Sequence, residues 1–328
     1  MDDHQLEAPE PSSQPNQSPP LQVSRHPIER VFVNDRGLRS GWRILIYLFQ
    51  VIFLGIAVNF VLGRVLHLPK NSTPPMWQMF LQEGLSFAIV FLPALLMARL
   101  ESRSSGDYGL PARSMFRVEF WHGVALGIVE ISVLIGSIAA CRGYSFGPLA
   151  EHGASLLKWA LLWAFFFVLV GLFEEFAFRG YLQFTLADGI GFWPAALLLS
   201  LGFGRVHLMN QGESPVGALS VVAIALVFAL ALRRTGNLWL VVGWHAAFDF
   251  GETFLFSVPN SGNVFPGHLS DATLHGPAWL TGGTVGPEGS VFSFLIMAAA
   301  AFYIHKAFPP KPRFVRTREH ASGTLPVA

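Results

Sequence analysis

The chain reads Gly171-Leu-Phe-Glu174-Glu175-Phe-Ala-Phe-Arg179-Gly180-Tyr-Leu182 at the end of a nearly unbroken apolar run, residues 156–173. That run is long enough to cross a bilayer as a helix. A charged side chain in a bilayer costs several kcal/mol, on the order of 3 on insertion scales. Since such a cost is seldom carried without a use, we interpret Glu174, Glu175 and Arg179 as part of a functional site that the other helices surround.

Helical spacing predicts different roles for these three side chains. Glu175 and Arg179 are four residues apart, so they lie on one face and can pair. Glu174 is turned by about 100° from Glu175. We therefore expect a structural Glu175–Arg179 pair and a free Glu174 carboxylate. The alternative is a charged cluster that only anchors the end of a helix at the membrane interface.

The composition indicates an all-α integral membrane protein. Of 328 residues, 52% are hydrophobic and only 13% charged, about half the charged fraction of a soluble domain. A net charge of +1 gives no indication of a nucleic-acid partner. The single cysteine, Cys141, excludes an internal disulfide framework and a Cys-rich metal site.

Apolar stretches long enough to span a bilayer recur along the chain. They predict about eight transmembrane helices around a polar intramembrane site. We place these helices at residues 42–66, 77–100, 119–141, 156–187, 192–209, 215–233, 237–256 and 288–307.

The ends of the chain differ from this membrane domain, residues 41–307. Residues 1–40 are rich in Pro, Gln and Ser and lack the basic start of a signal peptide, so we expect a disordered cytosolic tail. Residues 308–328 form a basic C-terminal tail. With eight spans and the N-terminus inside, 16 of the 22 Lys and Arg residues fall on the inside and four outside. This asymmetry predicts that both termini are cytosolic.

Residues 257–287 form one long external loop with six Gly and four Pro. A structureless loop of this length is uncommon. It is therefore either a cap or re-entrant piece over the site or a mobile connector.

Three further polar side chains are expected at the depth of Glu174. The helices that carry Glu174 and His207 join near residue 190, and both side chains lie about 25 Å from that turn at 1.5 Å per residue. The next-but-one helix carries His245 and Asp249 on one face, and tilting brings Asp249 to the same level. The spacing therefore favours a joint site over scattered packing residues.

Two chemistries suit this set of side chains. A carboxylate beside a neutral imidazole can deprotonate water, and a second histidine can donate hydrogen bonds to an oxyanion. Two histidines and a carboxylate are also a frequent catalytic Zn²⁺ set, which here would be Glu174, His207 and His245. The residues alone leave both chemistries open.

The motifs resemble those of the CAAX-protease and bacteriocin-processing (CPBP, or Abi) family of intramembrane endopeptidases. Glu174-Glu175-Phe-Ala-Phe-Arg179 matches Glu-Glu-x-x-x-Arg, Phe203-Gly-Arg-Val-His207 matches Phe-x-x-x-His, and His245-Ala-Ala-Phe-Asp249 matches His followed by Asn or Asp four residues later. The run Gly-Gly-Thr-Val-Gly-Pro-Glu288 also resembles bacterial members, and the similarity covers about residues 155–305.

The resemblance implies a membrane peptidase whose substrate is a protein or peptide in or at the lipid bilayer. Glu174 and His207 would activate water, and His245 and Asp249 would stabilise the oxyanion. Glu175, Arg179 and Phe203 would support the site. The family has been described both as metalloproteases and as metal-independent glutamate proteases. We favour the second description and commit to no cofactor, with Zn²⁺ as the alternative.

The resemblance also implies a multi-pass protein of the bacterial inner membrane. Because bacteria generally lack prenylated CAAX proteins, we do not extend that specificity to this chain. Two other functions compete with the peptidase: a non-catalytic immunity or scaffold protein on the same fold, and a proton-coupled transporter that uses the buried Glu, His and Asp side chains as a relay.

Overall fold

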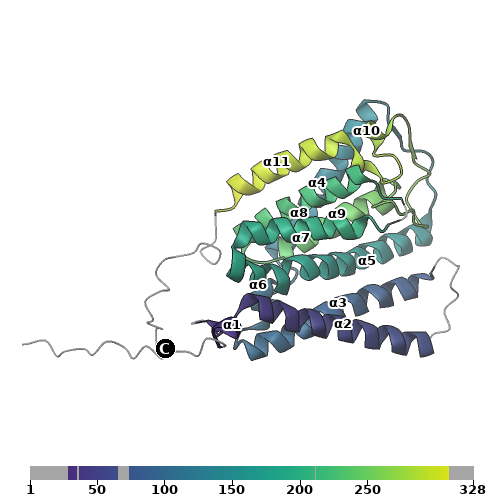
Figure 1. Ribbon diagram of the computed structural model, residues 1–328. Coiled ribbons are helices and arrows are strands. Elements are labelled where there is room, and N and C mark those ends of the chain that lie inside the picture. The colour runs from purple at the N-terminus through teal and green to yellow at the C-terminus, as the bar shows by residue number, and fades with distance from the viewer. Residues whose placement is uncertain (1–28, 35–36, 66–73, 211, 310–328) are drawn as a thin grey trace, which may run out of the picture. The chain divides into compact units, whose positions relative to one another are not determined.

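The computed structural model describes residues 29–34, 37–65, 74–210 and 212–309, and these residues are mostly helical. Figure 1 shows the long helices side by side. They are α2 Ser40–Val65, α3 Met76–Leu100, α4 Val118–Ala140, α5 Gly153–Arg179, α6 Tyr181–Ile190, α7 Phe192–His207, α8 Pro215–Thr235, α9 Trp239–Phe250 and α11 Val291–Ala307. Shorter elements are η1 Ser105–Tyr108, η2 Ala112–Ser114, β3 Tyr144–Ser145, the π-helix η3 Gly251–Leu255, β4 Thr273–Leu274, α10 Ala278–Thr281 and η4 Pro287–Gly289.

The described residues before α2 form a small unit of their own. It consists of helix α1, Glu29–Phe32, and an antiparallel hairpin of β1, Val33–Asn34, and β2, Gly37–Leu38. Most of the predicted N-terminal tail, residues 1–40, and nearly all of the predicted C-terminal tail lie outside the described residues.

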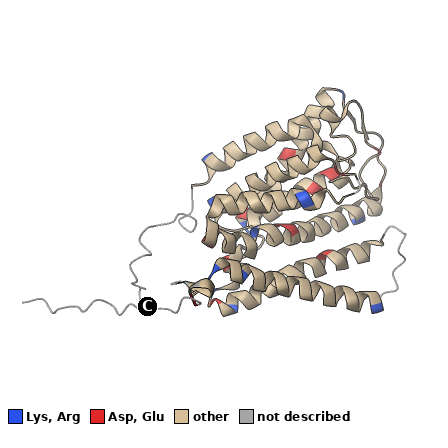
Figure 2. Ribbon diagram, viewed as in Figure 1, with Lys and Arg blue, Asp and Glu red and all other residues tan. Residues whose placement is uncertain are grey.

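Membrane-spanning length is clear for five stretches of the described chain. Figure 2 shows that the ribbon of these helices is largely free of charged residues. The five stretches that are long and apolar enough to cross a bilayer are Ser40–Val65, Met76–Leu100, Val118–Ala140, Gly153–Ile190 and Pro215–Thr235.

All eight predicted helical stretches are present, but the predicted count of eight spans is not confirmed. α7 has 16 residues, α9 has 12 and α11 has 17. At 1.5 Å per residue, even α11 is only about 26 Å long, against a hydrocarbon core of about 30 Å. These three helices are packed among longer ones and are shorter than a full crossing.

The predicted helix 156–187 is divided in two at Gly180. The backbone there turns to φ −81° and ψ −129°, which ends α5 and begins α6. A Cβ atom at Gly180 would lie 2.4 Å from the carbonyl oxygen of Phe176, so only glycine fits this break. The break lies one residue after Arg179 and therefore fixes where the charged end of α5 stops.

α9 is held against α4 by glycines that let the two backbones approach closely. A Cβ atom at Gly123 would lie 1.9 Å from the carbonyl oxygen of Leu240, and one at Gly127 would lie 2.3 Å from that of Trp244. On the α9 side, a Cβ atom at Gly243 would meet the carbonyl oxygen of Phe120 at 2.2 Å. Small residues of this kind replace the hydrophobic driving force between helices in lipid. They set the position of His245 and Asp249 on α9.

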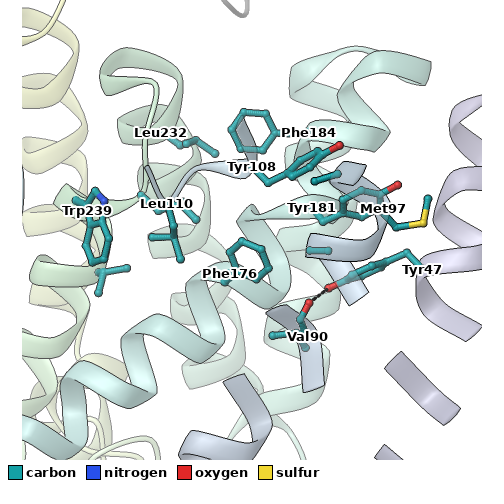
Figure 3. Packing of buried hydrophobic residues seen from close by; sticks show 14 of the residues in the cluster. Tyr47, Val90, Met97, Tyr108, Leu110, Phe176, Tyr181, Phe184, Leu232 and Trp239 are labelled. Atoms are coloured by element: carbon teal, nitrogen blue, oxygen red, sulfur yellow. Dashed lines mark hydrogen bonds between the residues drawn. The ribbon is translucent and has the colours of Figure 1, made fainter. Parts of the chain in front are cut away.

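An aromatic cluster joins α2, α3, α5 and α6 (Figure 3). The Tyr47 hydroxyl donates a hydrogen bond to the carbonyl oxygen of Val90 at 3.0 Å, and the Tyr47 and Tyr181 rings lie 4.5 Å apart. Beside the cluster, Glu101 accepts hydrogen bonds from Tyr108 and Tyr181, each at 2.6 Å, and pairs with Arg43. The partly buried Glu101 carboxylate therefore has partners from three elements, which offset the cost of removing its charge from water.

The long loop after α9 packs onto the helices as a cap. Its Pro266 and Gly267 carbonyls accept hydrogen bonds from the Trp163 indole at 3.2 and 3.0 Å. β4, within the loop, pairs with β3, which follows α4. Asn260, within the loop, is itself buried. Of the two alternatives for residues 257–287, the structure favours the cap.

Candidate functional site

The four residues that the sequence singles out converge from three helices. Glu174 comes from α5, His207 ends α7, and His245 and Asp249 lie on α9. The Glu174 Oε2 atom is 4.0 Å from His207 Nε2 and 3.7 Å from His245 Nε2. His245 Nε2 is also 3.5 Å from Asp249 Oδ2. The chemical roles of these side chains stay predictions.

A buried salt bridge supports His245 from behind. Arg179 donates hydrogen bonds to both carboxylate oxygens of Glu175, at 3.0 and 3.1 Å. The Glu175 side chain is fully buried, and its Oε1 atom also lies 2.8 Å from His245 Nδ1. The pair has the geometry that its spacing predicts. Its contact with His245 links two different helices and could not be inferred from spacing within α5.

His207 is oriented by its own helix. Its Nδ1 atom lies 3.0 Å from the carbonyl oxygen of Phe203, and a carbonyl oxygen can only accept. Nδ1 therefore carries the proton in this contact, and the lone pair of Nε2 faces Glu174. The Phe203 ring packs against the imidazole at 4.4 Å and against the Arg179 guanidinium at 4.5 Å.

Glu174 and His207 together form a place for a water molecule. Two acceptor atoms 4.0 Å apart leave room for one water oxygen about 2.8 Å from each, with one hydrogen directed at each acceptor. The lone pairs of that water would then point into the cavity. The Glu174 side chain is 24% exposed, whereas Glu175 is fully buried.

These groups border a cavity of about 220 Å³ that is rich in carboxylates. Among the lining residues that the structure describes there is no Lys or Arg. The polar lining residues are Glu83, Glu130, Glu174, His207, Asn210, Ser220, His245, Asp249, Asn260, Ser261, Asn263 and Glu288.

Several of these lining residues were missed by the sequence reasoning. Glu83 and Glu130 are lone carboxylates inside apolar helices, so the cost argument applied to Glu174 would have found them. Asn260 lies in a Gly- and Pro-rich loop without periodicity, where no pattern marks it. Its amide lies 3.4 Å from the Asp249 carbonyl oxygen, which ties the cap to the site.

Glu288, on the loop side of the cavity, has a strongly altered acidity. Burial, with the negative charges of Asp249 and Glu213 nearby, raises the pKa of Glu288 to about 8. Burial likewise raises the pKa of Glu213. A cation at this end of the cavity would therefore favour the ionised form of Glu288.

The donor set suits zinc chemically, but its spacing does not fit. Two histidines and a carboxylate are common zinc ligands, and both histidines have partners on Nδ1 that would orient them. Within the described part of the chain, however, no group of three or more His, Cys, Asp or Glu side chains is spaced to hold a metal ion.

Comparison with known proteins identifies the central part of the chain. Residues 156–251 match the family model described as type II CAAX prenyl endopeptidase Rce1-like. The chain carries an Rce1-like domain. No curated protein and no solved structure gives a significant match.

The Rce1-like domain contains the whole converging set. It includes Glu174, His207, His245 and Asp249, which come from three motifs on α5, α7 and α9. Since this is a protease family with an integral membrane fold, the protein is an integral membrane protein with a protease-type domain. The cap residues Asn260 and Glu288 lie beyond the matched range.

Proposed function

We propose that this protein is an intramembrane endopeptidase that hydrolyses a peptide bond of a membrane-associated protein or peptide. The observation that carries the proposal is the 4.0 Å separation of Glu174 and His207 beside a cavity, within an Rce1-like domain. This geometry supports a water molecule held by two acceptors, which is the arrangement needed for general-base attack on a carbonyl carbon.

In the proposed reaction, Glu174 takes a proton from the water molecule while the water oxygen attacks the carbonyl carbon of the peptide bond. His207 holds the second hydrogen of that water through Nε2. The peptide C–N bond then breaks, and the proton held by Glu174 passes to the leaving amine. The products are a carboxylic acid and an amine, so the atoms of one water molecule are fully accounted for.

His245 is the proposed oxyanion donor. Its Nδ1 is held by Glu175 and its Nε2 lies between Glu174 and Asp249. Because Glu175 can only accept from Nδ1, an N–H at Nε2 requires the imidazolium form of His245, which the surrounding carboxylates Glu174, Glu175 and Asp249 favour. That Nε2–H would point toward the developing oxyanion, while Asp249 keeps the ring in place. Donors fixed before the reaction stabilise charge without reorganisation, which is usually a large share of catalysis.

The proposed location is the bacterial inner membrane, with both termini in the cytosol. The excess of Lys and Arg on one side of the predicted spans supports the orientation, and the motif resemblance to bacterial members supports the choice of membrane. Prenylated CAAX proteins are not part of the proposal, because it rests on the hydrolytic groups and not on a prenyl-binding feature.

Metal dependence is tested on purified protein in detergent with a quenched peptide library, before and after a strong chelator. Metal analysis is done on the same samples. We expect cleavage to survive chelation without stoichiometric zinc. Cleavage lost on chelation and restored by Zn²⁺ would instead make Glu174, His207 and His245 metal ligands. Absence of cleavage in every condition would contradict the peptidase proposal and favour a binding-only protein.

A further inference from the structure

One wall of the cavity carries more carboxyl groups than the proposed hydrolysis uses. Glu130, from α4, and Glu288, from η4, line the cavity beside Asp249. Glu252, on η3, lies close enough to all three to interact electrostatically with them. The proposed water activation and oxyanion stabilisation give no task to these three glutamates.

Glu252 lies near this wall but is not among the described residues that line the cavity. Its side chain is fully buried, and among the described residues neither of its carboxylate oxygens has a hydrogen-bond partner. Buried carboxylates are normally paired or hydrogen-bonded. Glu252 lies in the π-helix η3, where the Phe256 amide donates a hydrogen bond to the Gly251 carbonyl oxygen at 2.9 Å. Single π-turns of this kind occur often at functional sites.

The other two glutamates keep free acceptor capacity. Glu130 accepts one hydrogen bond, from the Trp244 indole, and Glu288 accepts hydrogen bonds from the backbone amide and the side chain of Ser261. A carboxylate has about four acceptor positions. Both side chains can therefore accept further donors from a group inside the cavity.

The chemistry of the occupant follows from charge and spacing. With no Lys or Arg among the described lining residues, a cation must come from outside. The carboxylates are not spaced to hold one metal ion. An ammonium or guanidinium group carries several N–H donors and reaches carboxylates at hydrogen-bond length instead.

We propose that Glu130 and Glu288, with the charge of Glu252 close to both, form a subsite that binds a cationic group of the substrate, the side chain of a Lys or Arg residue near the cleaved bond. The subsite proposal rests on the proposed function, because Asp249 both lies beside these glutamates and contacts His245. The subsite gives the peptidase a preference for basic residues beside an apolar segment.

Binding is measured separately from cleavage, with the Glu174→Gln protein in detergent and fluorescein-labelled peptide pools. The pools differ at one central position, which is Lys, Arg or the uncharged norleucine, and each is made with a free and with an acetylated amino terminus. We expect the Lys and Arg pools to bind about tenfold more tightly than the norleucine pool. The acetylated pools separate a side-chain cation from a terminal amine.

The tighter binding of the Lys and Arg pools should disappear in Glu288→Gln and in Glu130→Gln. The amide oxygen in Glu288→Gln can still accept a hydrogen bond from the Ser261 backbone amide. The tighter binding should persist in Asp271→Asn, a control in the same loop whose side chain is 63% exposed. Equal binding of all pools, or a preference that survives both glutamine variants, would overturn the subsite. A preference for free amino termini alone would reassign it to a terminal amine and overturn the side-chain proposal.

The two proposals fail in different ways. If wild-type protein cleaves the norleucine and lysine pools equally, hydrolysis stands and the cation subsite is wrong. If no pool is cleaved but the lysine pool binds through Glu288, the subsite stands and the peptidase proposal is wrong.

Discussion

Two adjacent glutamates have opposite surroundings. Glu174 is partly exposed and faces two histidines, whereas Glu175 is fully buried between Arg179 and His245. The sequence predicts the first difference, because helical spacing turns the two side chains about 100° apart. It could not predict that Glu175 also contacts His245, 70 residues later in the chain.

The variant Glu175→Gln tests the supporting role. The amide leaves Arg179 without a charged partner inside the protein, where breaking a buried pair costs on the order of 3 kcal/mol. We expect a lower free energy of unfolding, seen as a lower melting temperature in detergent. The matched control is Glu174→Gln, which should melt close to wild type. If Glu175→Gln kept its stability but lost activity, Glu175 would be the water-activating residue and Glu174 the structural one.

At the level of elements, the approach of α9 to α4 decides where the second half of the site lies. Gly123, Gly127 and Gly243 bring the two backbones together. The apolar runs predict that both helices exist. The sequence contains many glycines, however, and their positions alone do not indicate which pairs of helices pack closely together. The depth estimate brings Glu174 and His207 together as the structure does, although the break at Gly180 places α6 between α5 and α7, which the estimate did not include.

We expect Gly123→Ala to push α9 away from α4. The added methyl group would lie 1.9 Å from the Leu240 carbonyl oxygen, so stability should fall by roughly 1–3 kcal/mol, with a loss of peptide cleavage. Thermal unfolding and cleavage rate are measured together. Gly136→Ala is the control on the same helix, where a Cβ atom meets nothing within 4 Å. Equal effects of the two substitutions on stability and cleavage would contradict the claim that the close contact of α4 with α9 positions the site.

For the whole molecule, the sequence predicts helical stretches more reliably than complete crossings. Hydrophobicity marks each helix, but the length of a helix depends on what it packs against, as α7 and α9 show. The cap over the cavity was left undecided because its contacts, such as Trp163 with Pro266, connect distant segments. The orientation in the membrane stays a prediction.

The single cysteine offers a direct test of that orientation. Cys141 follows α4 and is exposed, and with both termini in the cytosol it lies on the outer side. We expect a membrane-impermeant maleimide to label it on intact spheroplasts. A control with Cys141→Ser and Ala112→Cys, in the loop before α4, should react only after lysis. The reverse pattern would invert the topology.

The cleavage rate of Glu174→Gln, compared with wild type on the same quenched peptide library, tests the central claim most directly. Circular dichroism and melting temperature are recorded to show that the variant is folded, and Asp271→Asn serves as the surface control. Because an amide cannot take a proton from water, the account predicts a loss of at least about a hundredfold in a folded protein. A folded Glu174→Gln protein that cleaves at the wild-type rate would contradict it.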